Sequence, residues 1–204
     1  MINKEFKLNK PNYIVPYILE ERRNHAQAID IYSRLLEDRI IYMGEVFDSE
    51  TCNMIVAQLL YLDSLSNDPI NIYINSPGGS VIDGLSIIDA INFIKSPVYT
   101  ICTGIAASMG AVLLSCGEKG HRSVLPHSRV MIHQVSNELY GTYSDLEIEL
   151  KQTERCKKDI YNILANNLGK SYEEIEKLCD RNNWFIGKEA VDLGIVDKIL
   201  TKEK

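Results

Sequence analysis

Ser108 stands where a strand pattern gives way to an apolar helix, within Gly104-Ile-Ala-Ala-Ser-Met-Gly-Ala111. The first N–H groups of a helix lack partners within the helix, and the helix dipole is positive there, so negative charge is favoured beside this hydroxyl. The small residues Ala106, Ala107 and Gly110 let other backbone approach closely, much as in the Gly-x-Ser-x-Gly nucleophile turn. The segment thus indicates a nucleophilic serine, while a simple helix cap is the alternative, because serine is a preferred N-cap residue.

A serine nucleophile needs a base and fixed donors for the negative charge that develops on the substrate oxygen. Gly78 and Gly79 follow a strand pattern and lack side chains, so their N–H groups, with that of Met109, are candidate donors. A plain tight turn is the alternative. His133 ends an apolar strand, from which its side chain can project over the rim of a sheet, so it is the candidate base. A histidine with a purely structural role is the alternative.

Composition limits the function classes. The chain has 204 residues, 45% hydrophobic, and a formal net charge of -6, which argues against nucleic acid or an anionic membrane as the partner. Five cysteines without a Cys-x-x-Cys pair indicate a reducing compartment.

His121, His127 and His133 are evenly spaced, but no Asp, Glu or Cys shares their spacing, so we expect no metal. Segment 13–19 is too short and too interrupted by proline for a signal sequence, and no run reaches membrane-span length, so we expect a cytoplasmic protein.

The chain pattern predicts an N-terminal arm over residues 1–28 and one domain over residues 29–204. Apolar spacing predicts helices over 29–36, 49–64, 80–95, 144–169 and 188–193. It also predicts a helix from the Ser108 turn to about residue 116 and a shorter helix that begins at residue 171. It predicts strands over 40–43, 70–74, 98–102, 122–125, 129–132 and 195–200. Strand, glycine-rich turn and helix occur twice in succession, so we expect an α/β fold with a largely parallel sheet covered by helices.

Four strings resemble the proteolytic subunits of the caseinolytic Clp protease, the ClpP family. They are Asp30-Ile-Tyr-Ser-Arg-Leu-Leu36, Ile72-Tyr-Ile-Asn-Ser-Pro-Gly-Gly-Ser80, Gly104-Ile-Ala-Ala-Ser-Met-Gly-Ala111 and Ser128-Arg-Val-Met-Ile-His-Gln134. The similarity runs from about Tyr13 to the C-terminus, with the motifs in the family's order. It implies a ClpP/crotonase-like ββα superhelix with a protruding strand-helix handle.

The resemblance also implies roles for individual residues. Ser108 would be the nucleophile of a serine endopeptidase, His133 its base, and the N–H groups of Gly79 and Met109 the oxyanion hole. Alignment without a gap places Asn182 where most of the family carries the triad aspartate. An asparagine carbonyl can accept the imidazole N–H, but it lacks the charge that stabilises an imidazolium.

Further departures lie beyond the histidine. Val135 stands where the family usually has proline, and the glycine-rich segment that lines substrate and begins ring-to-ring contact reads Ser136-Asn-Glu-Leu-Tyr-Gly141. Asp180 and Arg181 resemble the positions of an inter-ring ion pair, with a solvated charge pair as the alternative. These departures fall at the positions that the resemblance links to the alignment of substrate and to the self-assembly of the chain.

The resemblance implies partners as well. Family members form seven-membered rings stacked in pairs and degrade unfolded polypeptides delivered by a AAA+ unfoldase. The unfoldase would contact a hydrophobic patch that includes Tyr73, and the arm before residue 28 would border the axial pore. The chain has no Gly-x-x-x-x-Gly-Lys-Ser/Thr loop, so ATP would be used by the unfoldase and the chain itself would need no cofactor.

Two other functions are compatible with these residues. The chain could be a weakly active structural ring partner of a Clp paralogue that has the aspartate triad, which Asn182 and Val135 motivate. It could also be an acyl-CoA enzyme of the related crotonase fold, because a similar oxyanion hole binds thioesters. The pairing of Ser108 with His133 argues against the acyl-CoA function.

Overall fold

A computed structural model describes residues 15–22 and 25–202, which divide into two compact units, the first ending at Asp38 and the second beginning at Arg39. In the first unit, strands β1 (Tyr17–Arg22) and β2 (His25–Asp30) form an antiparallel pair, followed by helix α1 (Ile31–Glu37). Residues 17–22 and 25–28 thus lie in strands where the composition predicts an arm, because local polarity does not reveal cross-strand pairing. The arm before residue 15 lies outside the described residues, and the division at residue 28 stays a prediction.

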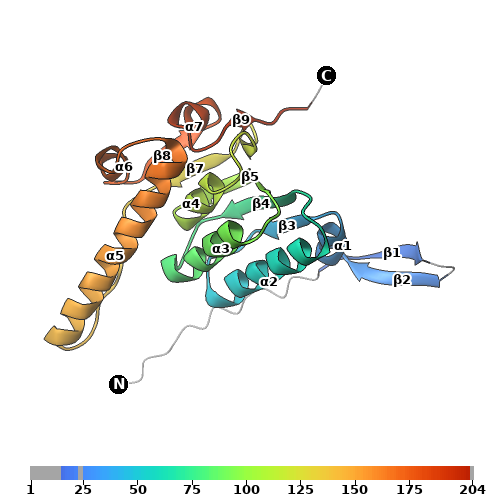
Figure 1. Cartoon of the computed structure of the whole chain (residues 1–204), viewed down its shortest axis with the longest axis horizontal. Helices are drawn as coiled ribbons and strands as arrows, with labels where there is room; N and C mark the ends of the chain where they lie inside the picture. Colours follow the sequence, from blue (N-terminus) through green and yellow to red (C-terminus); the bar gives the residue numbers. More distant parts are fainter. Residues whose placement is uncertain (1–14, 23–24, 203–204) are drawn as a thin grey trace. The chain divides into compact units, whose positions relative to one another are not determined.

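The second unit contains the main sheet (Figure 1). Its strands are β3 (Ile40–Met43), β4 (Ile70–Ser76), β5 (Val98–Ala107), β6 (Arg122–Val124), β7 (Arg129–Ile132), β8 (Asn183–Ile186) and β9 (Lys198–Ile199). The order β3-β4-β5-β6-β9 is parallel throughout, β7 pairs in parallel with β5, and β8 pairs antiparallel with β7. The expected α/β class with a largely parallel sheet is therefore confirmed.

Strand β5 organises this sheet because it pairs along both edges. One edge pairs with β4 from Val98 onward. The other edge pairs first with β6, over residues 100–102, and then with β7, over residues 105–107. The strand is therefore five residues longer than the predicted 98–102, since its second half is defined by pairing with a distant segment.

Two other strands also differ from the prediction. Strand β8 was not predicted, because a four-residue edge strand carries little periodicity of its own. Strand β9 covers only two residues of the predicted 195–200, because only that part pairs with β6. In both cases the partner strand decides where regular structure begins and ends.

Helices cover the sheet: α2 (Ser49–Leu65), α3 (Val81–Phe93), α4 (Met109–Ser115), α5 (Tyr143–Leu168), α6 (Tyr172–Leu178) and α7 (Lys188–Leu193). Helix α2 packs on α3, α3 on α4, and α4 on α5 (Figure 1). All seven residues of α4 are buried, so this helix is the centre of the core. None of the helices formed by residues 15–22 and 25–202 is long and apolar enough to cross a bilayer.

Helix α5 has two distinct halves. Its second half packs on the body through Cys156, Ile160, Tyr161 and Leu164, whereas the first half projects away from it (Figure 1). Residues 133–142, which lead into the helix, have no regular secondary structure. The handle is therefore present as a helix, but the strand expected before it is not formed.

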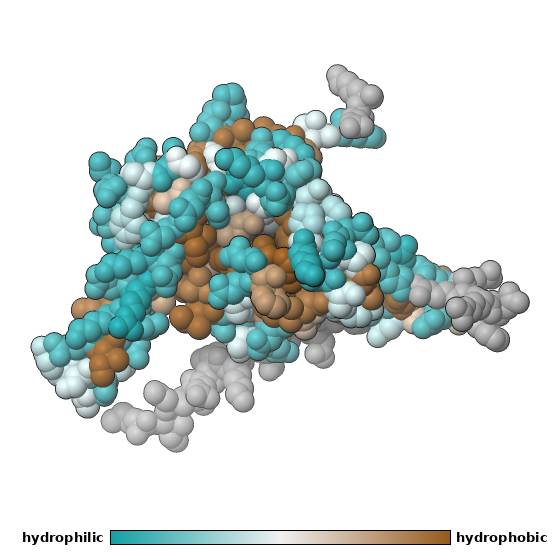
Figure 2. Space-filling model, viewed as in Figure 1, coloured by the Kyte–Doolittle hydropathy of each residue, from teal (hydrophilic) through white to brown (hydrophobic). Residues whose placement is uncertain are grey.

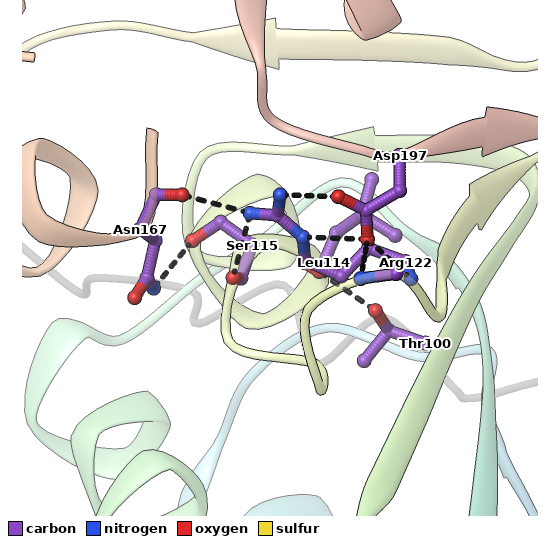
Figure 3. A network of polar contacts seen from close by, with 7 residues as sticks. Thr100, Leu114, Ser115, Arg122, Asn167 and Asp197 are labelled. Atoms are coloured by element: carbon purple, nitrogen blue, oxygen red, sulfur yellow. Dashed lines mark hydrogen bonds and ion pairs between the residues drawn. The ribbon is translucent and has the colours of Figure 1, made fainter. Parts of the chain in front are cut away.

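A buried polar network fixes the C-terminal end of α4 (Figure 3). The Arg122 guanidinium, whose side chain is 5% exposed, contacts both carboxylate oxygens of Asp197, at 2.6 Å and 3.0 Å. It also donates to the carbonyl oxygen of Asn167 on α5, and Asn167 Nδ2 donates to Ser115 Oγ on α4. The network therefore holds α4, α5 and the segment before β9 together.

The network predicts a specific loss of stability in acid. Burial alone would raise the pKa of Asp197, but the hydrogen bonds and charge of Arg122, with the Gly120 N–H, lower the pKa from 3.8 to about 2. Because the folded-state pKa is below the unfolded value, this stabilisation is complete above about pH 4 and is lost as the pH falls toward 2. The contribution should fall by about 1 kcal/mol between pH 5 and pH 3.

Urea unfolding of the wild type and the Asp197→Asn variant at both pH values measures this contribution. The variant should lose less stability on acidification than the wild type does. Asp192→Asn, which removes an exposed carboxylate on α7, is the control and should behave as the wild type. Equal acid sensitivity of wild type and Asp197→Asn would show that Asp197 is not an acid-sensitive site.

Candidate active site

Four segments meet at one edge of the sheet. Strands β4, β5 and β7 are parallel, so their carboxyl ends lie at the same edge, and the antiparallel β8 begins there. Ser108 follows β5, His133 follows β7, and Asn182 directly precedes β8. Clefts at the carboxyl ends of parallel strands are the usual ligand sites of α/β sheets.

Ser108 has an unusual backbone conformation, with φ 53° and ψ −122°. A positive φ is costly for a residue with a Cβ, so surrounding contacts must hold it in place. One contact is the hydrogen bond from the Ser108 N–H to the Met131 carbonyl oxygen, at 2.9 Å. The Ser108 side chain makes no capping hydrogen bond to α4. The helix-cap alternative is therefore not supported, and the hydroxyl remains available.

The turn after β4 presses against the Ser108 turn. A Cβ placed on Gly78, which has φ +94°, would lie 2.7 Å from Ser108 Cβ and 2.6 Å from the Ala107 carbonyl oxygen. The Gly78 N–H donates to Ser76 Oγ at 3.1 Å, so it is not available to a substrate. Among the described residues, no acceptor is found for the N–H of Gly79 or of Met109.

A cleft brings four of the predicted site residues together: Gly79, Ser108, Met109 and His133 line it. Its remaining wall is made by six apolar residues and two polar ones: Val81, Val112, Ile132, Val135, Ile160 and Leu164, with Gln134 and Ser136. Ser108 and His133 are both partly exposed, so a ligand in the cleft can reach them. Among the described residues, the lining contains no Asp, Glu, Lys or Arg.

Asn182 does not line this cleft, and its side chain is exposed. Its position relative to His133 follows from the strand register. Ile132 and Asn183 are the last paired residues of β7 and β8, so His133 and Asn182 are the next residues at the ends of adjacent strands. Directly opposite residues of paired antiparallel strands, such as Ile132 and Asn183, place their Cβ atoms about 5 Å apart, and His133 and Asn182 each lie one residue beyond that pair.

Two side-chain amides hold the turn that contains Asn182. Gln134 Nε2 donates to the Asp180 carbonyl oxygen at 2.8 Å, and Asn183 Nδ2 donates to the Leu178 carbonyl oxygen at 3.3 Å. Asp180 and Arg181 form an ion pair with each other at 3.7 Å, with side chains 72% and 87% exposed. Such an exposed pair contributes little to stability.

Sequence reasoning missed two residues near the site. Ser76, which is completely buried under the Pro77–Gly79 turn, lay inside a recognised motif but had no assigned role. Its signal was a serine directly before a Pro-Gly-Gly turn. Gln134 had no comparable signal, because its partner Asp180 is 46 positions away. Over residues 15–22 and 25–202, no group of three or more His, Cys, Asp or Glu side chains could hold a metal ion.

Comparison with known proteins defines the class. The chain matches the Clp protease family over residues 22–203. It is 49% identical over 198 residues to an ATP-dependent Clp protease proteolytic subunit of Bacteroides fragilis, covering 96% of this chain and 95% of that protein. A protein of the same name from Porphyromonas gingivalis is 50% identical over 196 residues, which cover 95% of this chain and 87% of that protein. The ATP-dependent Clp protease proteolytic subunit 1 of Salinibacter ruber is 45% identical over 190 residues, which cover 93% of this chain and 82% of that protein.

Fold and family together define a serine protease. Within that class the chain belongs to the Clp protease family, and its function is that of a proteolytic subunit. The resemblance noted in the sequence is therefore confirmed at the level of the family. The acyl-CoA alternative has no support from these matches.

The close approach of the two turns predicts an unequal effect of two glycine substitutions. Gly78 and Gly120 both have positive φ, +94° and +90°, but a Cβ on Gly120 would meet nothing within 4 Å. Gly120→Ala should lower the free energy of unfolding by about 1 kcal/mol, the cost of the left-handed backbone alone. Gly78→Ala should cost roughly 3 kcal/mol or more, because overpacking against Ser108 is added.

Urea denaturation of the two variants checks this difference. Peptide hydrolysis should fall in Gly78→Ala and remain near the wild-type rate in Gly120→Ala. Equal losses of stability in the two variants would mean that the Pro77–Gly79 turn does not support the Ser108 turn.

Proposed function

We propose that Ser108, His133 and Asn182 form the catalytic triad of a serine endopeptidase, with the N–H groups of Gly79 and Met109 as the oxyanion hole. The observation that carries this proposal is that Ser108, His133, Gly79 and Met109 all line one cleft. The segments that contribute these four residues are far apart in sequence, and their meeting in one cleft supports a shared role.

In the proposed reaction, Ser108 Oγ attacks the peptide carbonyl carbon while His133 takes its proton. The carbonyl oxygen becomes negatively charged and accepts hydrogen bonds from the Gly79 and Met109 N–H groups. His133 then gives the proton to the leaving amine, and an acyl group remains on Ser108. Water, deprotonated by His133, then attacks the ester carbon. The bond from this carbon to Ser108 Oγ breaks, His133 returns the proton to Oγ, and the second product leaves as a carboxylic acid. The apolar wall of the cleft favours a substrate with an apolar side chain next to the cleaved bond.

Asn182 would orient His133 by accepting its Nδ1–H through the side-chain carbonyl. The strand register supports this role, since the two residues continue adjacent strands beyond their last pair. A neutral amide cannot stabilise the imidazolium that forms during attack. We therefore expect slower catalysis than from a charged triad, in which an Asp→Asn change can cost roughly 10⁴ in rate.

The first test concerns the nucleophile. A serine-reactive fluorophosphonate should label the wild type at Ser108, and the label should be located by peptide mass spectrometry. Ser108→Ala should abolish both labelling and hydrolysis of a short fluorogenic peptide, because no other group replaces the attacking oxygen. Ser128→Ala, which removes a buried hydroxyl bonded to the Cys102 carbonyl, should keep both. Labelling elsewhere but never at Ser108 would contradict the assignment.

The second test concerns the charge of the triad. Asn182→Asp should raise kcat for the same peptide by tenfold or more, since a carboxylate stabilises the imidazolium. Asn67→Asp places the same charge on the exposed loop before β4, at the opposite edge of the sheet, and should leave kcat nearly unchanged. A wild-type rate in Asn182→Asp would indicate that the charge at this position does not limit turnover.

We propose self-assembly into paired seven-membered rings that receive unfolded polypeptides from a AAA+ unfoldase, which uses the ATP, in the cytoplasm as part of protein quality control. Exposed apolar side chains support contact between subunits (Figure 2). They lie on α2 and α3 as Met54, Leu60, Leu65, Ile82 and Phe93, and on the projecting half of α5 as Tyr143, Ile148 and Leu150. Tyr42, 40% exposed, pairs in register with the half-buried Tyr73 and would extend the unfoldase patch.

A second candidate function is that of a weakly active ring partner for a Clp paralogue with an aspartate triad. The irregular segment 133–142 favours it, because the strand expected there would align substrate and begin ring-to-ring contact. Sedimentation of the chain alone, and mixed with such a paralogue, separates the two functions. Double rings with peptide turnover from this chain alone would eliminate the second candidate.

A further inference from the structure

Ser76 is a completely buried serine at the end of β4, directly beneath the Pro77–Gly79 turn. Its hydroxyl makes two hydrogen bonds. It donates to the Glu45 carbonyl oxygen at 2.5 Å and accepts from the Gly78 N–H at 3.1 Å. A buried hydroxyl with both functions used fixes the orientation of the groups it joins, since either partner would be left unpaired without it.

The hydrogen bonds around the turn determine where the Gly79 N–H points. The Gly78 carbonyl oxygen accepts from the Phe47 N–H at 2.9 Å, and the Ser80 N–H donates to the Phe47 carbonyl oxygen at 2.8 Å. In a trans peptide the C=O and the following N–H point in opposite directions. Because the Gly78 C=O points toward Phe47, the Gly79 N–H points away from Phe47.

The opposite side of the turn is the Ser108 side. A Cβ on Gly78 would lie 2.7 Å from Ser108 Cβ and 3.0 Å from the Met109 nitrogen, and Gly79 lines the cleft with both residues. The turn therefore lies between Phe47 and Ser108. Ser76 holds the first peptide of this turn, and Phe47 holds the next two.

Ser76 also touches the segment that supplies the second donor. A Cβ on Gly110, in the first turn of α4, would lie 3.0 Å from the Ser76 carbonyl oxygen. The register pairs Ser76 with Ala106 of β5, two residues before Ser108. The backbone of one residue thus borders both the Gly79 turn and the Met109 turn.

We infer that Ser76 is a positioning residue that sets the oxyanion hole, by locking the Pro77–Gly79 turn so that the Gly79 N–H faces the reacting carbonyl. This inference rests on the proposed function. Ser76 does not touch substrate: it acts through the Gly78 N–H, which its Oγ binds. Its loss should weaken the stabilisation of the transition state more than the binding of substrate.

The test compares Ser76→Ala, Ser76→Cys and Ser128→Ala with the wild type. Ser128 is the matched control, since it is 2% exposed and its hydroxyl also donates to a main-chain carbonyl. For Ser76→Ala we expect kcat with a fluorogenic peptide to fall roughly tenfold or more, while KM stays within twofold of the wild-type value. This decrease in kcat should be smaller than the decrease caused by removing an oxyanion donor itself. The kcat of Ser76→Cys should lie between those of the wild type and Ser76→Ala, because a thiol is a weak donor and acceptor.

Thermal unfolding of every variant separates positioning from general destabilisation. The melting temperatures of Ser76→Ala and Ser128→Ala should fall by similar amounts, while kcat should fall only in Ser76→Ala. A wild-type kcat in folded Ser76→Ala, or an equal loss in Ser128→Ala, would overturn the inference. Where Ser76→Ala does not fold, a wild-type kcat in Ser76→Cys overturns it and a reduced kcat with unchanged KM supports it. Failure of a fluorophosphonate to label Ser108 in the wild type would instead overturn the proposed function, and this inference with it.

Discussion

The parallel pairing of β5 with β4 on one edge and β7 on the other is the constraint on which the site depends. It sets the ends of three strands level, so the chain must turn three times at one edge of the sheet. The hydrogen bond from the Ser108 N–H to the Met131 carbonyl extends this pairing beyond the last residue of β5. A shift of β5 by one residue against either neighbour would separate the serine turn from the glycine turn or from the histidine.

The two halves of the site are supported differently. Ser108 leads into a helix whose residues are all buried, and contacts with β4 and β7 hold its positive φ. Such a backbone conformation costs of order 1–3 kcal/mol, which the surrounding core offsets. His133 and Asn182, by contrast, lie beyond the last paired residues of β7 and β8, and the Gln134 amide contributes one hydrogen bond between their segments.

Local patterns were enough to predict the helices, most of the parallel core strands and four of the residues that line the cleft. Glycines after strands and a serine before an apolar helix are short-range signals with a direct structural meaning, and Gly79 and Ser108 indeed share a cleft. The features that the sequence did not predict depend on contacts with residues far away in the chain. Strand β8 and the second half of β5 exist through pairing with β7, and the Gln134–Asp180 hydrogen bond joins segments that no local pattern connects. The role of Asn182 stays a prediction.

Helix α4 has no solvent-facing side, and this has a consequence for how the protein tolerates change. A substitution anywhere along it disturbs the same close packing that holds the strained serine, so reactivity and fold stability cannot drift independently. Because the core is the last part of a fold to open, the hydroxyl should keep its alignment until the chain unfolds as a whole. Loss of the nucleophile's reactivity on warming should therefore coincide with the melting transition.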